Sequence, residues 1–320
     1  MDCPNVSIII LNWNGKENTV NCLEALKLTT YSNYEIIVVD NGSTDGSVKY
    51  FKDHYPEIKL IENGSNLGFA EGNNVAIREV LKRGEIKYIA LLNNDTIVEP
   101  DWLEYLVNAL ESDESVGSCQ PKILLLNNPD TIDAIGISVN RCGAAYQEGR
   151  NEKDLGQYSK ITEVFGVCAG AALYRTKMLN HTGLFDKDFF AYYEDVDLAT
   201  RARLFGWKSV CVPRAVIYHI HSATLGNDSP FKKYLLERNS YYYVIKNLPP
   251  KVIMLFLISK AHSGFFTLLY LARTRNFKMI KSLVKGNLDA IGNLPLMISK
   301  RTDIQAKKLM SKENFKMWLK

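Results

Sequence analysis

Short runs rich in β-branched residues alternate with segments of helical length through the first 125 residues, and no other feature restricts the fold of this chain as much. Such alternation is typical of an α/β chain with a mostly parallel central sheet and helices on both faces. We expect strands at residues 6–11, 35–39, 59–61, 88–92 and 117–126. We expect helices at residues 15–28, 45–54, 70–83 and 100–112, mostly opened by Ser, Thr, Asp or Pro.

Polar clusters directly follow four of the expected strands. They read NWNG (12–15), DNGSTDGS (40–47), ENGSNLGFAEGNN (62–74) and NNDT (93–96). In sheets of this kind, ligands bind outside the carboxyl ends of the strands. The sequence therefore predicts a binding site along this edge.

The patterns after residue 126 are less regular. Residues 141–160 are Gly-rich and polar, which predicts a loop or an irregular hairpin. The stretch VFGVCAGAALYR resembles a strand pair, residues 193–205 a helix, and residues 208–218 one or two further strands.

Charge divides the chain near Pro249. Residues 251–320 carry 14 Lys and Arg against 3 Asp and Glu, whereas the first 250 residues carry 25 against 32. An acidic body argues against a nucleic-acid partner, and a basic, apolar tail suits an anionic membrane surface. Two alternatives stay open, because the tail could equally pack on the body as ordinary structure or form a homodimer interface.

The tail combines apolar runs with a basic helical pattern. The runs 252–259 and 264–272 are separated by Lys260 and His262, and neither reaches the roughly 20 residues that span a bilayer. Farther on, apolar residues recur at helical spacing while lysines lie off the stripe, as in an interfacial amphipathic helix. The stripe consists of Phe277, Ile280, Val284, Leu288 and Ile291.

The six cysteines are scattered, without the spacing of a disulfide framework or a zinc site. The stretch MDCPNVSIII enters a strand pattern at once and has no basic segment followed by a cleavage site. We therefore expect a cytoplasmic protein, held peripherally at the inner face of the cell membrane by its tail.

Two acidic clusters are candidates for chemistry. Asp95, flanked by Asn93 and Asn94, is well placed to hold a divalent cation whose other ligands are phosphate and water; an Asx turn that caps the next helix explains it equally well. Glu194 and Asp195 open an expected helix after the aromatic run FFAYY. A carboxylate beside apolar rings holds its proton more tightly, which suits a general base, although acids also stabilise any helix N-terminus.

Two histidines end the stretch VIYHIH. In an extended strand His219 and His221 point to the same face, so they can meet a metal or a phosphate together. The sequence lacks a G-x-G-x-x-G dinucleotide fingerprint, a G-x-x-x-x-G-K-[ST] phosphate loop, H-E-x-x-H and G-x-S-x-G. The common nucleotide, zinc-protease and hydrolase motifs are therefore excluded.

Taken in chain order, these motifs closely resemble the inverting nucleotide-sugar glycosyltransferases of family 2, which have the GT-A fold. The resemblance covers about residues 4–240, and it is most similar to the rhamnosyltransferase-type branch that builds surface polysaccharides. It rests on VSIIILNWNG, EIIVVDNGSTDGS, NLGFAEGNN, LLNNDTIVEPDWL, FFAYYEDVDLATRARLFGWK and VIYHIHSAT. It implies a GT-A domain at residues 1–248, with a nucleotide-binding half at about 1–125 and an acceptor half at about 126–248, followed by a helical basic tail at 249–320.

The resemblance also implies roles for single residues. Asp195 matches the catalytic base, and NND occupies the family's D-x-D position, so that Asp95 ligates a metal that His219 helps to hold. Two of the usual acids are amides here, which puts the strictness of the metal dependence in doubt. The implied donor-binding residues are Trp13, Asp40, Asn66, Gly68, Asn73, Asn93 and Asn94. The implied acceptor or diphosphate contacts are Glu194, Arg238 and His221, although Arg238 could also be a solvated helix charge.

The implied reaction moves one sugar from a pyrimidine nucleotide-sugar, with dTDP-L-rhamnose preferred, to a hydroxyl of a lipid-linked glycan. Mg²⁺ or Mn²⁺ would be the cofactor. A UDP-hexose donor (glucose, galactose, galactofuranose or N-acetylglucosamine) is the alternative within the same class. A catalytically degenerate module that binds a glycan or a partner is the alternative of another class.

Two related enzyme classes fit less well. A sugar-phosphate nucleotidylyltransferase would carry a Gly-rich, Arg-bearing loop after the first strand, and NWNGKEN is not such a loop. A processive polysaccharide synthase would carry a Q-x-x-R-W motif, which no glutamine of this chain begins.

Overall fold

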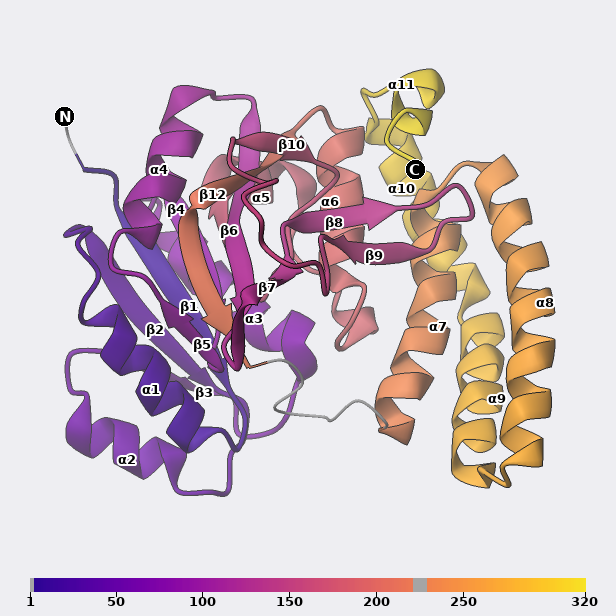
Figure 1. Cartoon of the computed structure of the whole chain (residues 1–320), viewed down its shortest axis with the longest axis horizontal. Helices are drawn as coiled ribbons and strands as arrows, with labels where there is room; N and C mark the ends of the chain where they lie inside the picture. The colour runs from indigo at the N-terminus through magenta and orange to yellow at the C-terminus, as the bar shows by residue number, and fades with distance from the viewer. Residues whose placement is uncertain (1–2, 221–228) are drawn as a thin grey trace.

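A mixed sheet forms the centre of the protein, whose computed structural model describes residues 3–220 and 229–320 (Figure 1). The strands of this sheet are β1 (Val6–Asn12), β2 (Tyr34–Asp40), β3 (Lys59–Glu62), β4 (Tyr88–Asn93), β5 (Thr96–Val98), β6 (Val116–Leu125), β7 (Asn128–Ala134), β10 (Thr162–Val164), β11 (Ala171–Arg175) and β12 (Lys208–His219). A separate hairpin consists of β8 (Gly136–Val139) and β9 (Ala145–Glu148). The loop or irregular hairpin expected within 141–160 contains one strand of this hairpin, β9, whereas its partner β8 lies before residue 141.

The helices of the body are α1 (Lys16–Leu26), α2 (Ser47–His54), α3 (Gly68–Arg83), α4 (Trp102–Ser112), α5 (Thr176–Thr182) and α6 (Glu194–Leu204), with a short 3₁₀ turn, η1 (Lys187–Phe189), ahead of α6. The C-terminal helices are α7 (Pro230–Asn247), α8 (Pro250–Arg273), α9 (Phe277–Gly292), α10 (Leu294–Lys307) and α11 (Lys312–Lys316). The strands and helices expected in the first 125 residues are all present, with bounds shifted by at most a few residues.

The strand order in the sheet is β10-β12-β6-β11-β4-β1-β2-β3. β1 runs parallel to both β2 and β4, and β2 runs parallel to β3, whereas β11 is antiparallel to β4 and β6. The register places Asn12 opposite Asp40 and Leu11 opposite Asn93. The polar strand ends predicted from sequence therefore meet at one edge.

The hydrophobic core has a layer on each face of the sheet. Buried side chains of α1, α2 and α4 pack on one face, and those of α3, α5 and α6 pack on the other. Ile8, Ile9 and Ile10 of β1 are all fully buried, as expected for a parallel strand that helices cover on both sides. This arrangement confirms the α/β fold class.

The C-terminal helices share a third core cluster with the body. Phe189 and Val196, beside the expected catalytic acids, pack in the same cluster as Met297 of α10 and Phe315 of α11. The backbone N–H of Arg141 also donates to the carbonyl oxygen of Lys320 at 2.9 Å. The tail is therefore joined to the body by a common core.

One expectation about the tail needs correction. The apolar runs 252–259 and 264–272 are not separate short segments, since both belong to the single 24-residue helix α8. Among the described residues, α8 is long and apolar enough to cross a membrane by length and composition, which is weak evidence by itself. Lys260, between the runs, is part of the continuous helix. Its charge is paired, because its Nζ lies 2.8 Å from Oε2 of Glu237 on α7.

Candidate active site

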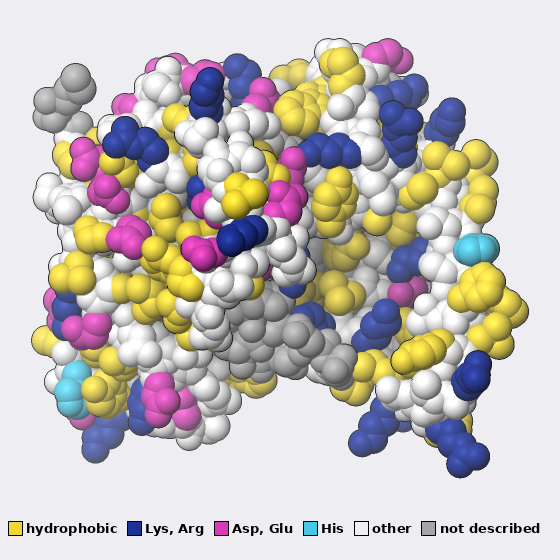
Figure 2. All heavy atoms as spheres, viewed as in Figure 1, with side chains coloured by type: hydrophobic (Ala, Val, Ile, Leu, Met, Phe, Trp, Pro, Cys, Tyr) yellow, Lys and Arg dark blue, Asp and Glu magenta, His cyan; other side chains and the backbone are white. Residues whose placement is uncertain are grey.

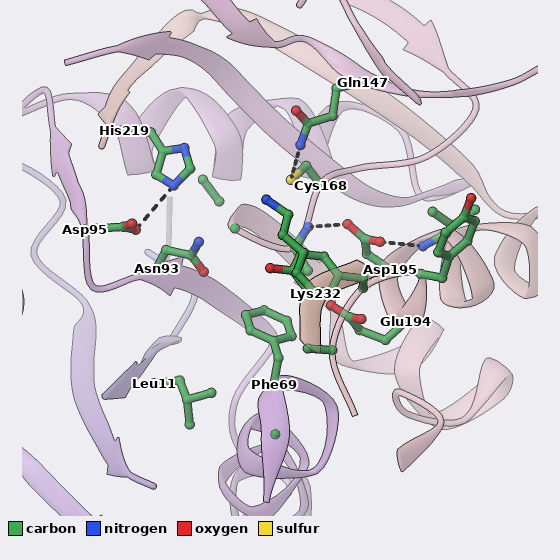
Figure 3. Close-up of a pocket in the computed structure, with 18 of the residues that line it drawn as sticks. Leu11, Phe69, Asn93, Asp95, Gln147, Cys168, Glu194, Asp195, His219 and Lys232 are labelled. Carbon is green, nitrogen blue, oxygen red and sulfur yellow. Dashed lines mark hydrogen bonds and ion pairs between the residues drawn. The ribbon is translucent and has the colours of Figure 1, made fainter. Parts of the chain in front are cut away.

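A cavity of about 480 Å³ lies at the carboxyl ends of β1 and β4 (Figure 3). The other walls of the cavity come from the loop that enters α3, the turn before α6, β9 and the first turns of α7. Nine of the residues predicted to form the site line this cavity. They are Trp13, Asn66, Gly68, Asn93, Asn94, Asp95, Glu194, Asp195 and His219.

On one side of the cavity, two strand ends bring Asp95 and His219 together. The backbone N–H of Ile220, directly after β12, donates to the carbonyl oxygen of Asp95 at 2.9 Å. His219 Nε2 lies 3.3 Å from Asp95 Oδ1, and His219 Nδ1 lies 2.8 Å from Oδ2 of Asp133 on β7. Burial opposes protonation of His219, but Asp133 and Asp95 outweigh it and raise its pKa to about 9.

The same residues fit a divalent cation. Asp95 Oδ1 is buried, and no described residue donates a well-aligned hydrogen bond to it. Asp133 fixes the ring of His219 through Nδ1, which is how carboxylates orient metal-ligating histidines, and it leaves Nε2 facing Asp95. Within residues 3–220 and 229–320, no group of three His, Cys, Asp or Glu could hold a metal by itself. A cation here would therefore need ligands from the substrate, such as phosphate oxygens.

On the other side of the cavity, Glu194 and Asp195 open α6. Asp195 accepts hydrogen bonds from the backbone N–H of Val196 at 2.8 Å and of Ala169 at 3.4 Å. Burial raises the pKa of Asp195, although these backbone donors oppose the shift. Burial, and then the charge of Asp195, raises the pKa of Glu194 well above its usual range. Two neighbouring acids that hold protons tightly are suited to acid–base work.

A short backbone connection links the two sides of the cavity. The N–H of Asn93, at the end of β4, donates to the carbonyl oxygen of Gly170 at 2.8 Å. Asp195 accepts from the N–H of Ala169, the residue directly before Gly170. Asp195 and the Asn93–Asp95 edge are thus fixed relative to one another by residues 168–170, which line the cavity.

The turn directly before α6 has an unusual backbone. Phe190, Tyr192 and Tyr193 all have positive φ, of 65°, 68° and 72°. Phe190 is the centre of a γ-turn, because the N–H of Ala191 donates to the carbonyl oxygen of Phe189 at 2.8 Å. Such conformations cost about 1–3 kcal/mol for each residue and persist only where the surroundings hold them.

Three residues expected at the site do not line the cavity. Asp40 is buried and accepts from the N–H groups of Gly42 at 3.1 Å and Ser43 at 2.9 Å, so it shapes the loop after β2. Asn73 is buried and donates to the carbonyl oxygen of Phe69 at 2.8 Å. Arg238 also lies off the lining, and its guanidinium group donates to the carbonyl oxygens of Asp188 and Phe189. His221 lies outside the described residues.

Several lining residues were not expected from the sequence. Gln147 of β9 donates to the thiol of Cys168 at 3.5 Å, and Arg150 and Lys232 bring positive charge to the cavity. Asp133, the second carboxylate at His219, also lines it. None belongs to a recognisable motif, so only the three-dimensional structure could reveal them.

The sequence model of the family described as "Glycosyl transferase family 2" matches residues 7–183. The chain belongs to glycosyltransferase family 2. This stretch contains β1 to β4 and the Asn93–Asp95 edge of the cavity, whereas Glu194, Asp195 and His219 follow it.

The family 2 chain is similar to named relatives over most of its body. It is 26% identical over 253 residues to the N-acetylglucosaminyl-diphospho-decaprenol L-rhamnosyltransferase of Mycobacterium tuberculosis, covering 69% of this chain and 78% of the relative. It is 21% identical over 224 residues to a poly-beta-1,6-N-acetyl-D-glucosamine synthase of Staphylococcus epidermidis, covering 69% of this chain and 51% of that relative.

Solved structures share the fold of this glycosyltransferase at low sequence identity. The crystal structure of a GalNAc-transferase with UDP, GalNAc and Mn²⁺ aligns with a TM-score of 0.58 and 14% identity over 77% of this chain, which spans half of that structure's length. A mannosyltransferase of Pyrobaculum calidifontis in complex with GDP-Man and Mn²⁺ aligns with a TM-score of 0.54 and 15% identity, covering 90% of this chain and 87% of that one. These likenesses confirm the GT-A fold.

Proposed function

We propose that this glycosyltransferase moves one sugar, with inversion, from a pyrimidine nucleotide-sugar to a hydroxyl of a lipid-linked glycan used in surface polysaccharides. The observation that supports it best is the placement of Asp195 and of the Asp95–His219 pair on opposite sides of one cavity. The base then faces the acceptor, and the other pair faces the leaving diphosphate.

The proposed reaction is a single displacement at the anomeric carbon. Asp195 takes the proton of the acceptor hydroxyl while its oxygen forms the new glycosidic bond. The bond from the anomeric carbon to the diphosphate oxygen breaks, and the electron pair leaves with the nucleotide diphosphate. Glu194, buried beside Asp195, orients the acceptor.

Asp95 and His219 would hold a Mg²⁺ or Mn²⁺ ion, with Asp133 fixing the imidazole. When bound, the ion neutralises the charge that develops on the leaving diphosphate. Asn93 and Asn94 line the same edge and offer neutral amides to the sugar or ribose. Lys232 and Arg150 add positive charge on the cavity wall, which favours an anionic donor or acceptor.

The donor we prefer is dTDP-L-rhamnose, with UDP-hexoses as the alternative. Asp40, which the resemblance implies as a donor-binding residue, lies off the cavity, so this preference rests on the rhamnosyltransferase relative.

A thermal-shift and calorimetric screen, with and without Mn²⁺, tests the donor preference. The compounds are dTDP-L-rhamnose, UDP-glucose, UDP-galactose, UDP-galactofuranose, UDP-N-acetylglucosamine and GDP-mannose. We expect metal-assisted binding of one pyrimidine nucleotide-sugar, followed by transfer. Binding of GDP-mannose alone contradicts the donor class, and binding without transfer to any glycan lipid indicates a degenerate module.

We further propose that α8 and α9 lie on an anionic membrane surface at the cytoplasmic face. α8 is mostly exposed, and apolar side chains lie on the surface at this side of the molecule (Figure 2). The predicted apolar stripe of α9 also faces outward, because the helix packs on the body through Leu283, Gly286 and Ala290 instead. The exposed apolar side chains of the two helices are Met254, Leu257, Ile258, Phe265, Phe266, Leu268, Leu269, Tyr270, Phe277, Val284, Leu288 and Ile291.

Replacing both Phe265 and Phe266 with Ser is expected to weaken binding to phosphatidylglycerol-containing vesicles at least about 10-fold, since each exposed ring would lose its apolar contact with lipid. Co-sedimentation measures the effect. Leu28→Ser together with Leu155→Ser, two exposed leucines on the body, is the matched control. Equal sedimentation of both double variants contradicts the membrane proposal, and a change from dimer to monomer mass indicates a homodimer interface.

A further inference from the structure

The strained turn at residues 190–193 is held by one buried amide of α7. Asn239 is fully buried, and its Nδ2 lies 2.8 Å from each of the carbonyl oxygens of Phe189, Ala191 and Tyr192. Its neighbour Arg238 donates to the carbonyl oxygens of Asp188 at 2.9 Å and Phe189 at 3.0 Å. These bonds satisfy carbonyl groups that the irregular backbone leaves without helical or strand partners.

The strain is concentrated at this turn. Six residues other than glycine have positive φ in the described chain, and three of them lie at positions 190, 192 and 193. Residues in such conformations need surroundings that over-determine them. Asn239 meets that need, because its two amide hydrogens are shared among the carbonyl oxygens of residues 189, 191 and 192.

The far side of the turn touches the donor half of the cavity. The carbonyl oxygen of Phe190 accepts from the N–H of Ala70 at 3.0 Å, at the start of α3. Gly68 has a φ of +78°, and a Cβ there would stand 2.5 Å from the same carbonyl oxygen. The turn therefore lies directly against the loop that enters α3, and its four residues line the cavity next to Glu194 and Asp195.

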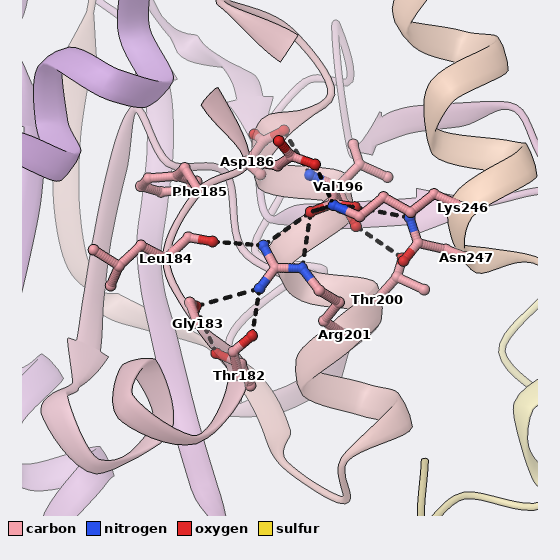
Figure 4. A network of polar contacts seen from close by, with 12 residues as sticks. Thr182, Gly183, Leu184, Phe185, Asp186, Val196, Thr200, Arg201, Lys246 and Asn247 are labelled. Atoms are coloured by element: carbon pink, nitrogen blue, oxygen red, sulfur yellow. Dashed lines mark hydrogen bonds and ion pairs between the residues drawn. The ribbon is translucent and has the colours of Figure 1, made fainter. Parts of the chain in front are cut away.

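A network of charges fixes the chain just before this turn. Lys300 of α10 lies 2.6 Å from carboxylate oxygens of both Asp186 and Asp188. Lys246 of α7 bridges Asp186 and Asp197 of α6, at 2.6 and 2.8 Å (Figure 4). The start of the segment is thus anchored independently, and the turn itself depends on Asn239 and Arg238.

We infer that Asn239 is a positioning residue that holds the 190–193 turn against the start of α3, so that Asp195 faces the acceptor hydroxyl. The inference rests on the proposed function, because Asp195 is the base in that proposal. Arg238 supports the same turn from the preceding position, which gives this arginine a role other than binding the diphosphate.

The test compares Asn239→Ala and the milder Arg238→Gln with Asn287→Ala. Asn287 is a suitable control because its Nδ2 also joins two helices of this bundle, at 3.2 Å from Oε1 of Glu237, but does not touch the turn. Hydrogen exchange of the amides of Ala191 and Ala70, kcat, donor affinity by calorimetry and the melting temperature are measured for each full-length variant.

We expect exchange at Ala191 and Ala70 to rise at least 10-fold in Asn239→Ala, and kcat to fall about 10- to 100-fold, because small misplacements of a reacting group are that costly. Donor affinity should fall by a smaller factor than kcat, since Trp13, Asn93 and Asn94 at the ends of β1 and β4 are untouched and only the loop that enters α3 is loosened. The acidic limb of the kcat profile should move to lower pH as water reaches Asp195 and its pKa falls. Arg238→Gln should show the same effects more weakly.

Unchanged exchange at Ala191, or a loss of kcat that Asn287→Ala reproduces at an equal loss of melting temperature, overturns the inference. Should Asn239→Ala not fold, Arg238→Gln decides in the same way. If the wild-type protein binds and transfers no sugar, the proposed function fails instead, and the exchange data still report whether Asn239 holds the turn.

Discussion

Replacing Asp195 with Asn is expected to lower kcat for sugar transfer by about 10²- to 10⁴-fold, the usual contribution of a positioned general base. The amide keeps the shape of the side chain and can still accept from the N–H of Val196, but it cannot take the acceptor's proton. Donor affinity should survive, because the nucleotide contacts lie on the opposite wall. Steady-state kinetics together with calorimetric titration of the donor measure both quantities.

Glu194→Gln shows which of the two neighbouring acids is the base. We expect this variant to lose less kcat than Asp195→Asn and to change mainly the KM for the acceptor. Near-normal turnover of Asp195→Asn combined with an inactive Glu194→Gln would transfer the role of base to Glu194.

The pH profile of the wild-type enzyme follows from the same pair. Burial raises the pKa of Asp195, and a base works only when deprotonated, so kcat should climb with pH through a value above the ordinary aspartate range and then level off. Besides Glu194, the groups that face Asp195 include the thiol of Cys168 and the phenols of Tyr174 and Tyr193, whose pKa values burial raises so that all three stay neutral. The acidic limb is absent in Asp195→Asn if the assignment holds.

Replacing Asp95 with Asn is expected to remove the benefit of Mn²⁺ for binding of the nucleotide diphosphate. The carboxylate is the only negative ligand that β4 supplies, because its neighbours Asn93 and Asn94 are amides, and hard cations require anionic oxygen. Calorimetric titration of the nucleotide diphosphate with and without Mn²⁺ measures the effect without relying on turnover. A fall of at least about 10-fold in the metal-dependent part of the affinity is expected, from the loss of one charged ligand.

Asp53→Asn, an exposed carboxylate on α2, is the matched control and should bind the nucleotide as the wild type does. Conversely, Asn94→Asp adds an acid at the same edge and should strengthen metal-dependent binding. A Mn²⁺ benefit that persists in Asp95→Asn shows that the ion is held elsewhere or is dispensable.

The central strands were predictable because local pattern and burial agree there. The stretch from residue 6 to residue 12 is apolar throughout most of its length, and it lies in the middle of a parallel sheet where both faces are covered. The hairpin of β8 and β9 was only half predicted, since neither strand has a strong alternating pattern and their pairing depends on contacts with the C-terminal helices. The apolar runs of α8 were misjudged for a related reason: a single lysine interrupts a pattern without interrupting a helix.

The acids that line the cavity were predictable from motif order, but what each polar side chain contacts was not. Asp40 and Asn73 stand in motifs that suggest ligand contact, yet the side chain of Asp40 bonds the backbone of the loop after β2 and that of Asn73 bonds the backbone of its own helix, α3. A sequence does not distinguish a polar side chain that binds a ligand from one that binds the chain itself. Asn239 shows the converse, because nothing in LLERNSYYY marks an amide that meets three carbonyl groups of a segment about 50 residues earlier.

The contact between Lys300 and Asp186 joins positions that are 114 residues apart. During synthesis, β1 to β4 can pair once the first hundred residues have emerged. Lys246 of α7 can then pair with Asp186, but Lys300, the lysine that joins Asp186 to Asp188, arrives only with α10. At about 5–20 residues per second this interval lasts roughly 6 to 23 seconds. A nascent chain therefore completes the β1–β4 edge of the cavity well before Lys300 can complete the charge network ahead of α6.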